Sequence, residues 1–67
     1  MYILVDLTNL EIQDVYYLYS KEDIIDVCQQ NLNSEDENAE IITDFEKAKE
    51  ILLTRFKYKV CEVKNND

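Results

Sequence analysis

Carboxylates are the side chains of this sequence with the greatest capacity for chemistry. Glu35, Asp36, Glu37 and Glu40 place four oxygen-ligand groups within six positions, and such ligands suit Ca²⁺ or Mg²⁺. The run lacks the glycine turn and the alternating ligand spacing of a calcium-binding loop, and the chain contains no glycine at all. We therefore expect no metal site beyond weak adventitious binding, and no cofactor.

The two thiols, Cys28 and Cys61, are the other reactive groups, and there is no histidine. Without histidine the chain lacks the side chain that normally titrates near neutral pH, and two thiols alone make no zinc site. Both cysteines have apolar neighbours, which favours small buried hydrophobic residues. A disulfide between them is the alternative.

Catalysis is disfavoured by composition and size together. The lack of glycine excludes phosphate-cradling loops and nucleophile elbows. A chain of 67 residues also leaves little room for a catalytic cleft. The sequence therefore predicts that the protein is not an enzyme.

The net charge of −8 is distributed unevenly. Residues 1–46 hold twelve acids and one base, whereas residues 47–67 hold three acids and six bases. The acids expected at the surface form two groups, which are Glu22, Asp23 and Asp26, and then Glu35, Asp36, Glu37, Glu40, Asp44 and Glu46. Both groups lie near expected helix starts or in the loop between helices, so we expect one acidic surface.

Two interpretations of this acidic surface remain open. Carboxylates on a rigid scaffold resemble a track of phosphates, so the surface would dock on a basic site of a nucleic-acid-binding protein. Direct binding to nucleic acid is disfavoured because the same field repels phosphates. Alternatively, the acids at helix starts stabilise the helix dipoles by about 0.3–1 kcal/mol each, and the acidic loop keeps a small protein soluble.

A tyrosine-rich segment supplies the second functional hypothesis. Tyr16 and Tyr17 must face opposite sides of a strand, so at least one of them faces outward or lies at a rim. Tyr17 and Tyr19 are the candidate partner contacts, since tyrosine is favoured at binding hot spots. A core this small is marginal, so the alternative function is an adaptor or a self-associating module, such as a homodimer, that uses this strand edge. The structural interpretation is half-buried cover for the sheet.

Alternating apolar residues predict three strands. Residues 1–8 form the first, and residues 10–19 form the second with a bulge near Gln13 and Asp14, the two making an antiparallel hairpin. Residues 57–64 form the last strand, which we expect to pair beside the first. Residues 39–43 are ambiguous, and we favour a short extended segment.

Two helices are predicted from capping residues and apolar stripes. Ser20 caps a helix over residues 21–32, closed by Asn31 or Asn33 in the left-handed conformation. Thr43 and Glu46 form a capping box for a second helix over residues 44–56. The apolar stripes are Ile24, Val27, Cys28 and Leu32 in the first helix, and Phe45, Ala48, Leu52 and Phe56 in the second.

The expected element order is β-β-α-(β)-α-β in a single acidic domain over residues 1–67, with 64–67 as a frayed tail. We predict an α+β fold, a two-layer sandwich with two amphipathic helices on one face of a small, mostly antiparallel sheet. The first apolar run is broken by Asp6 and has no basic residues before it. We therefore expect a cytoplasmic protein without a membrane partner.

In size, acidity, its Asn-, Asp-, Ile- and Lys-rich composition and its lack of catalytic residues, the chain resembles small acidic accessory proteins of phages and mobile elements, including anti-CRISPR proteins. The resemblance covers general character and includes no shared motif. It implies a phage-type inhibitor, acting as a nucleic-acid mimic, that blocks a host nuclease such as a CRISPR nuclease or another DNA-handling enzyme. It implies no particular fold, because such proteins differ widely in structure.

Overall fold

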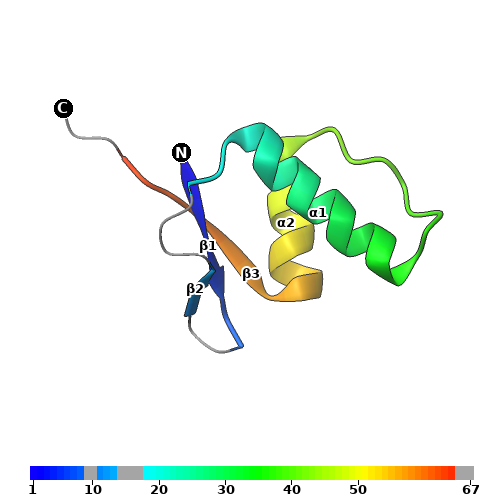
Figure 1. Cartoon of the computed structure of the whole chain (residues 1–67), viewed down its shortest axis with the longest axis horizontal. Coiled ribbons are helices and arrows are strands. Elements are labelled where there is room, and N and C mark those ends of the chain that lie inside the picture. The colour runs from blue at the N-terminus through cyan, green and yellow to red at the C-terminus, as the bar shows by residue number, and fades with distance from the viewer. Residues whose placement is uncertain (9–10, 14–17, 65–67) are drawn as a thin grey trace.

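Three strands and two helices follow one another along the chain, as the computed structural model describes it for residues 1–8, 11–13 and 18–64. The elements are β1 (Tyr2–Asp6), β2 (Glu11–Gln13), α1 (Lys21–Glu35), α2 (Phe45–Phe56) and β3 (Tyr58–Glu62) (Figure 1). The strands form an antiparallel sheet in the order β2-β1-β3. The predicted α+β class is confirmed, and so is the pairing of the last strand beside the first.

Strand β1 turns Leu4 towards the helices. This residue is 3% exposed and joins a core that also contains Ile24 and Leu52. Because side chains alternate along a strand, Ile3 and Val5 lie on the opposite face of the sheet, where both are half-buried. The uniformly apolar side of β1 is therefore not the side on which the helices pack.

The pairing along the edge of β1 that faces β2 changes register. Leu4 pairs with Gln13, whereas Tyr2 pairs with Tyr19 through two backbone hydrogen bonds of 2.8 Å. Two steps along β1 thus correspond to six steps along the neighbouring segment. The bulge predicted near Gln13 and Asp14 falls where residues 14–17 lie outside the described residues, so it stays a prediction.

Helix α1 begins as predicted but ends later. Ser20 accepts a hydrogen bond from the Asp23 amide, and the Asp23 carboxylate accepts one from the Ser20 amide, both at 3.1 Å. This reciprocal capping box fixes the first turn. Its buried stripe consists of Ile24, Cys28 and Leu32, with Val27 half-buried.

The predicted end of α1 at Leu32 was wrong by three residues. The side-chain nitrogen of Asn31 donates to the Val27 carbonyl at 2.8 Å, and the Ser34 hydroxyl donates to the Asn31 carbonyl at 2.8 Å. Both bonds lie within the helix, and neither Asn31 nor Asn33 takes the left-handed conformation. The helix ends at Glu35, and its cap residue Asp36 is extended.

Contacts at both ends show that the two helices run in the same direction. At their first residues, the Lys21 ammonium lies 5.5 Å from the centre of the Phe45 ring. At their last turns, Arg55 donates to the Glu35 carboxylate at 2.9 Å. The chain must therefore return along the helices, over about 20 Å, between the end of α1 and the start of α2.

Residues 36–44, which we call the return segment, make this crossing. Nine residues can span about 30 Å when extended, so the segment is long enough for the crossing. It forms no strand or helix within the described chain. The possible strand over residues 39–43 therefore does not form, and the segment adds no strand to the sheet.

Helix α2 begins at Phe45, one residue later than predicted, and its cap lies one residue later as well. The Asp44 carboxylate accepts from the Glu46 amide at 3.3 Å, so Asp44 is the cap and the predicted Thr43–Glu46 capping box was wrong. Aspartate is the stronger of the two capping residues. Lys57 ends the helix in the left-handed conformation, with φ 61° and ψ 36°, and β3 follows immediately.

The core lies between the sheet and the helices, which occupy the same side of the strands in Figure 1. Among the residues whose burial the structure describes, it contains seven buried ones, Leu4, Ile24, Cys28, Leu32, Ile42, Ala48 and Leu52. Phe45 and Phe56 from the predicted stripe are half-buried against it. Both cysteines are free thiols, with Cys28 buried and Cys61 half-buried. The disulfide alternative is therefore excluded in this structure.

Candidate docking surface

The parallel helices regroup the candidate acids. Glu22, Asp23 and Asp26 in the first turns of α1 lie at the same end of the molecule as Asp44 and Glu46 at the start of α2. Glu35, Asp36 and Glu37 lie at the far end, about 20 Å away along α1. The return segment, which carries Glu40, runs between the two ends (Figure 1).

Three of these acids have structural roles as caps. Asp23 and Asp44 accept hydrogen bonds from backbone amides at the starts of α1 and α2. Asp36 accepts the Asn38 amide at 2.9 Å, which holds the turn after α1. For these three residues, stabilisation of a helix end or turn is a sufficient reason for the carboxylate.

Three more acids form ion pairs with bases of α2. Glu40 pairs with Lys47 at 3.2 Å, and the other pairs are Glu46 with Lys49 at 3.0 Å and Glu35 with Arg55 at 2.9 Å. The pairs are largely exposed to solvent, so each contributes about 0.2–1 kcal/mol. The basic last third of the sequence thus neutralises part of the acidic first two-thirds.

Glu22, Asp26 and Glu37 are the candidate acids left over. Their carboxylates are exposed and make no hydrogen bond or ion pair with residues 1–8, 11–13 or 18–64. Glu22 and Asp26 are four positions apart and share one side of α1. The exposed Gln30 and Asn33 continue that side towards Glu37 in the turn after the helix. We call these five residues the outer stripe.

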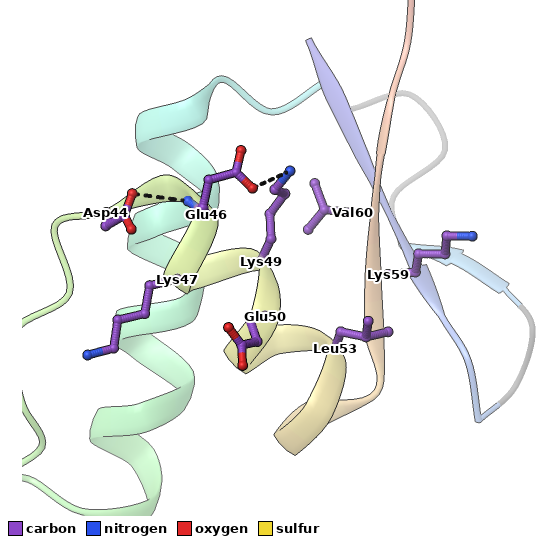
Figure 2. A pocket seen from close by; sticks show the side chains of 8 residues that line it. All are labelled: Asp44, Glu46, Lys47, Lys49, Glu50, Leu53, Lys59 and Val60. Carbon is purple, nitrogen blue, oxygen red and sulfur yellow. Dashed lines mark hydrogen bonds and ion pairs between the residues drawn. The ribbon is translucent and has the colours of Figure 1, made fainter.

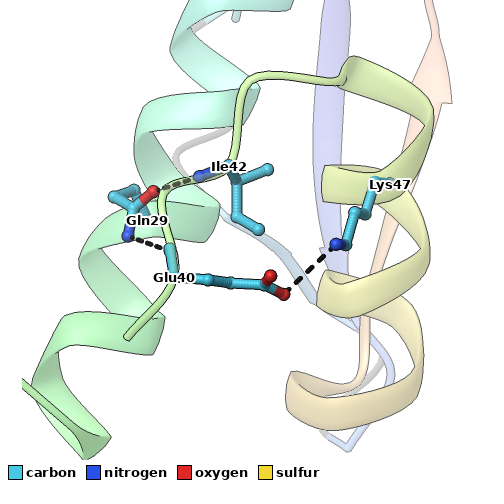
Figure 3. Close-up of polar contacts among 4 residues, drawn as sticks. All are labelled: Gln29, Glu40, Ile42 and Lys47. Atoms are coloured by element: carbon cyan, nitrogen blue, oxygen red, sulfur yellow. Dashed lines mark hydrogen bonds and ion pairs between the residues drawn. The ribbon is translucent and has the colours of Figure 1, made fainter. Parts of the chain in front are cut away.

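Gln29 holds the return segment against α1 (Figure 3). Its side-chain nitrogen donates to the Glu40 carbonyl at 3.0 Å, and its side-chain oxygen accepts from the Ile42 amide at 2.7 Å. Ile42 is buried, and its neighbour Ile41 is 78% exposed. Sequence reasoning missed both Gln29 and Ile41. The adjacent isoleucines were the available signal, because neighbouring residues of an extended segment face opposite sides.

Of the two tyrosine candidates, only Tyr19 lies within the described residues. Tyr19 is half-buried, packs against the core and pairs through its backbone with Tyr2. This position fits the interpretation of tyrosine as sheet cover, while its predicted contact with a partner stays a prediction. Tyr17 lies outside the described residues.

An open groove of ≈ 720 Å³ lies between α2 and β3 (Figure 2). It is lined by Asp44, Glu46, Lys47, Lys49, Glu50, Leu53, Lys59 and Val60. Lys49 is paired to Glu46 across its rim, and Leu53 is 43% exposed. The groove therefore combines an apolar strip with charges of both signs, which sequence reasoning did not predict.

The buried thiol has no features of a nucleophile. Burial raises the pKa of Cys28 above its ordinary value, and the nearby Arg55 guanidinium opposes that shift. The protonated form, which is the less nucleophilic one, is favoured. Across the part of the chain that the structure describes, no three thiol or carboxylate residues gather to hold a metal ion.

No helix among the described residues has the length and apolar character needed to span a membrane. Comparisons of the chain with protein-family models, with curated proteins and with solved structures find no match. The geometry and chemistry of the surface are therefore what indicate a function.

Proposed function

We propose that this chain is a small non-catalytic binding protein that docks through the outer stripe and the return segment on a basic site of another protein. The partner is a nucleic-acid-binding protein, and the chain acts as a phage-type inhibitor of the kind that blocks a CRISPR nuclease. The observation that carries the proposal is the set of unpaired, exposed carboxylates at Glu22, Asp26 and Glu37.

Unpaired carboxylates suit this role because docking breaks no internal contact. Their field attracts a basic partner and raises the rate of association. Glu22 and Asp26 are carried by a capped helix whose opposite side is buried at Ile24, Cys28 and Leu32, so their spacing is fixed before binding. Preorganisation of this kind lowers the entropic cost of association.

Ile41 supplies an apolar contact within the same surface. It lies between Glu40 and the buried Ile42 on the return segment, and 78% of its surface is exposed. Docking interfaces commonly surround an apolar centre with a polar rim. Ile41 would be that centre, with Glu37 and Glu40 beside it.

The ion-paired acids add to this surface at small cost. Glu35 and Glu40 are held by exposed pairs with Arg55 and Lys47, and such pairs contribute little to stability. A partner arginine would replace either base with little loss of folding free energy. Within this proposal the protein acts in the cytoplasm of the host cell, where the nuclease lies.

The test is capture of partners from the native host extract at low and high salt, with identification by mass spectrometry. The double variant Glu22→Lys/Asp26→Lys should lose the partner, because two uncompensated charges are reversed. The matched control is Glu50→Lys/Glu62→Lys, which changes the net charge equally at exposed acids away from the outer stripe. It should retain most of the binding.

Capture that is indifferent to salt and to the Glu22/Asp26 reversal would overturn the proposal. Capture that instead fails in Tyr19→Ala and ignores salt would favour the adaptor hypothesis. An Ile41→Ser variant completes the design, since this exposed side chain should matter for binding and hardly at all for folding.

A further inference from the structure

Strand β3 has an unoccupied backbone edge. The bonds from Leu7 N–H to the Lys57 carbonyl and from Val63 N–H to the Met1 carbonyl, both 2.8 Å, mark the hydrogen-bonded pairs of the β1–β3 ladder. Because these pairs alternate in an antiparallel ladder, Tyr58, Val60 and Glu62 direct their N–H and C=O groups away from β1. No other described strand pairs with that side.

The open groove lies beside this edge. Val60 and Leu53 form its apolar strip, and α2 forms the facing wall (Figure 2). An extended segment added along β3 would place alternate side chains into the groove and the others on the opposite face of the sheet. The geometry thus combines backbone pairing with a side-chain pocket, as in recognition by strand addition.

The charges specify what the added segment should carry. Lys57, Lys59 and Lys64 are exposed and make no ion pair with the described residues. Figure 2 shows the Lys59 side chain pointing away from α2, so acids of the added strand belong on that side. Glu50 on the α2 wall disfavours further acids within the groove, where apolar side chains fit Val60 and Leu53.

A second copy of this chain fits the edge less well. Antiparallel pairing of two β3 strands about Val60 would place Lys59 of each copy diagonally across the ladder from Lys59 of the other, within reach of such long side chains, so their like charges repel. Lysines on edge strands are a common protection against such self-pairing. The complementary occupant therefore comes from another protein.

We propose that the free edge of β3 takes up an extended segment of a partner protein in which apolar and acidic residues alternate. The apolar residues enter the groove against Val60 and Leu53, and the acidic residues face Lys59. This surface lies away from the outer stripe of α1, so the proposal stands whether or not the acidic surface docks on a nuclease.

Amide hydrogen exchange tests the proposal with two blocked peptides of equal length, one alternating valine with aspartate and one alternating valine with lysine. In the free chain the amides of Tyr58, Val60 and Glu62 should exchange fast, and those of Lys59 and Cys61 slowly. The Val/Asp peptide should slow exchange at the first three, and the Val/Lys peptide should not. Equal effects of the two peptides, or no protection by the Val/Asp peptide at millimolar concentration, would overturn the proposal.

Two charge reversals sharpen the test. Lys59→Glu should weaken binding of the Val/Asp peptide by about tenfold, the effect of roughly one charge contact. Lys21→Glu changes the net charge equally at the start of α1 and should leave binding nearly unchanged. Protection of Tyr58, Val60 and Glu62 that rises with protein concentration, without any peptide, would assign the edge to a second copy and reject the partner segment.

Discussion

In α1, the return segment and the first turn of α2, six of the nine candidate acids are bound to a backbone amide or to a base of α2, and Gln29 fastens the backbone of the return segment. At β3 three exposed lysines, one on the strand and two just beyond its ends, make no ion pair with the described residues, and no described strand occupies one of its backbone edges. The acidic region, which stands out in the sequence, therefore uses most of its charge in internal contacts. The region around β3 leaves more of its charges and backbone hydrogen-bonding groups available for a partner.

The largest expected change in stability distinguishes the core side of α2 from its groove side. Leu52 is fully buried in the core, while its neighbour Leu53 lines the groove and is 43% exposed. Leu52→Ala should lower the free energy of unfolding by about 2–5 kcal/mol because it opens a cavity. Leu53→Ala should change it by less than about 0.5 kcal/mol. Urea denaturation measures both, and similar losses would show that the groove side is part of the core.

The next effect concerns the attachment of the return segment. Gln29→Ala removes the acceptor of the part-buried Ile42 amide, so the free energy of unfolding should fall by about 1–3 kcal/mol. The control Gln30→Ala alters an exposed neighbour and should have little effect. Faster exchange of the Ile42 amide in Gln29→Ala would locate the loss. Unchanged exchange there would mean that the segment is held by its apolar contacts alone.

Local signals in the sequence predicted most of the elements. Ser20 caps α1 as predicted, and the buried stripes of both helices lie at the predicted spacing. Such features depend on residues within one or two turns of each other. The predictions for the end of α1 and the cap of α2 were wrong because several residues able to cap a helix lie side by side at each place, and the sequence alone does not decide between them.

The candidate site was harder to predict, because it depends on contacts between distant residues. The sequence identified the acids, but the parallel course of the helices decides which ones meet Lys47 or Arg55. The free edge of β3 follows from strand order, which places β1 in the centre. Ile41 and Gln29 become informative only once the return segment is known to cross beside α1.

A smaller change in stability is expected at the junction between α2 and β3. Lys57 is left-handed, with φ 61°, a conformation that costs a residue with a side chain about 1–2 kcal/mol. Lys57→Gly should raise the free energy of unfolding by about 0.5–1 kcal/mol, because the strain outweighs the added entropy of the unfolded chain. Lys57→Gln keeps the strain and removes the charge, so it should show no gain. A gain in both variants would attribute the effect to charge.

The smallest effect is expected for the ion pair that joins the return segment to α2. A double-mutant cycle of Glu40→Ala and Lys47→Ala should give a coupling energy of about 0.2–1 kcal/mol that declines with salt, since both side chains are half-exposed or more. Glu46 with Lys49, a pair within α2, serves as the control. A weak coupling matters for function, because a basic partner could then take Glu40 from Lys47 without unfolding the return segment. A coupling well above this range would make Glu40 a structural residue and confine docking to Glu22, Asp26 and Glu37.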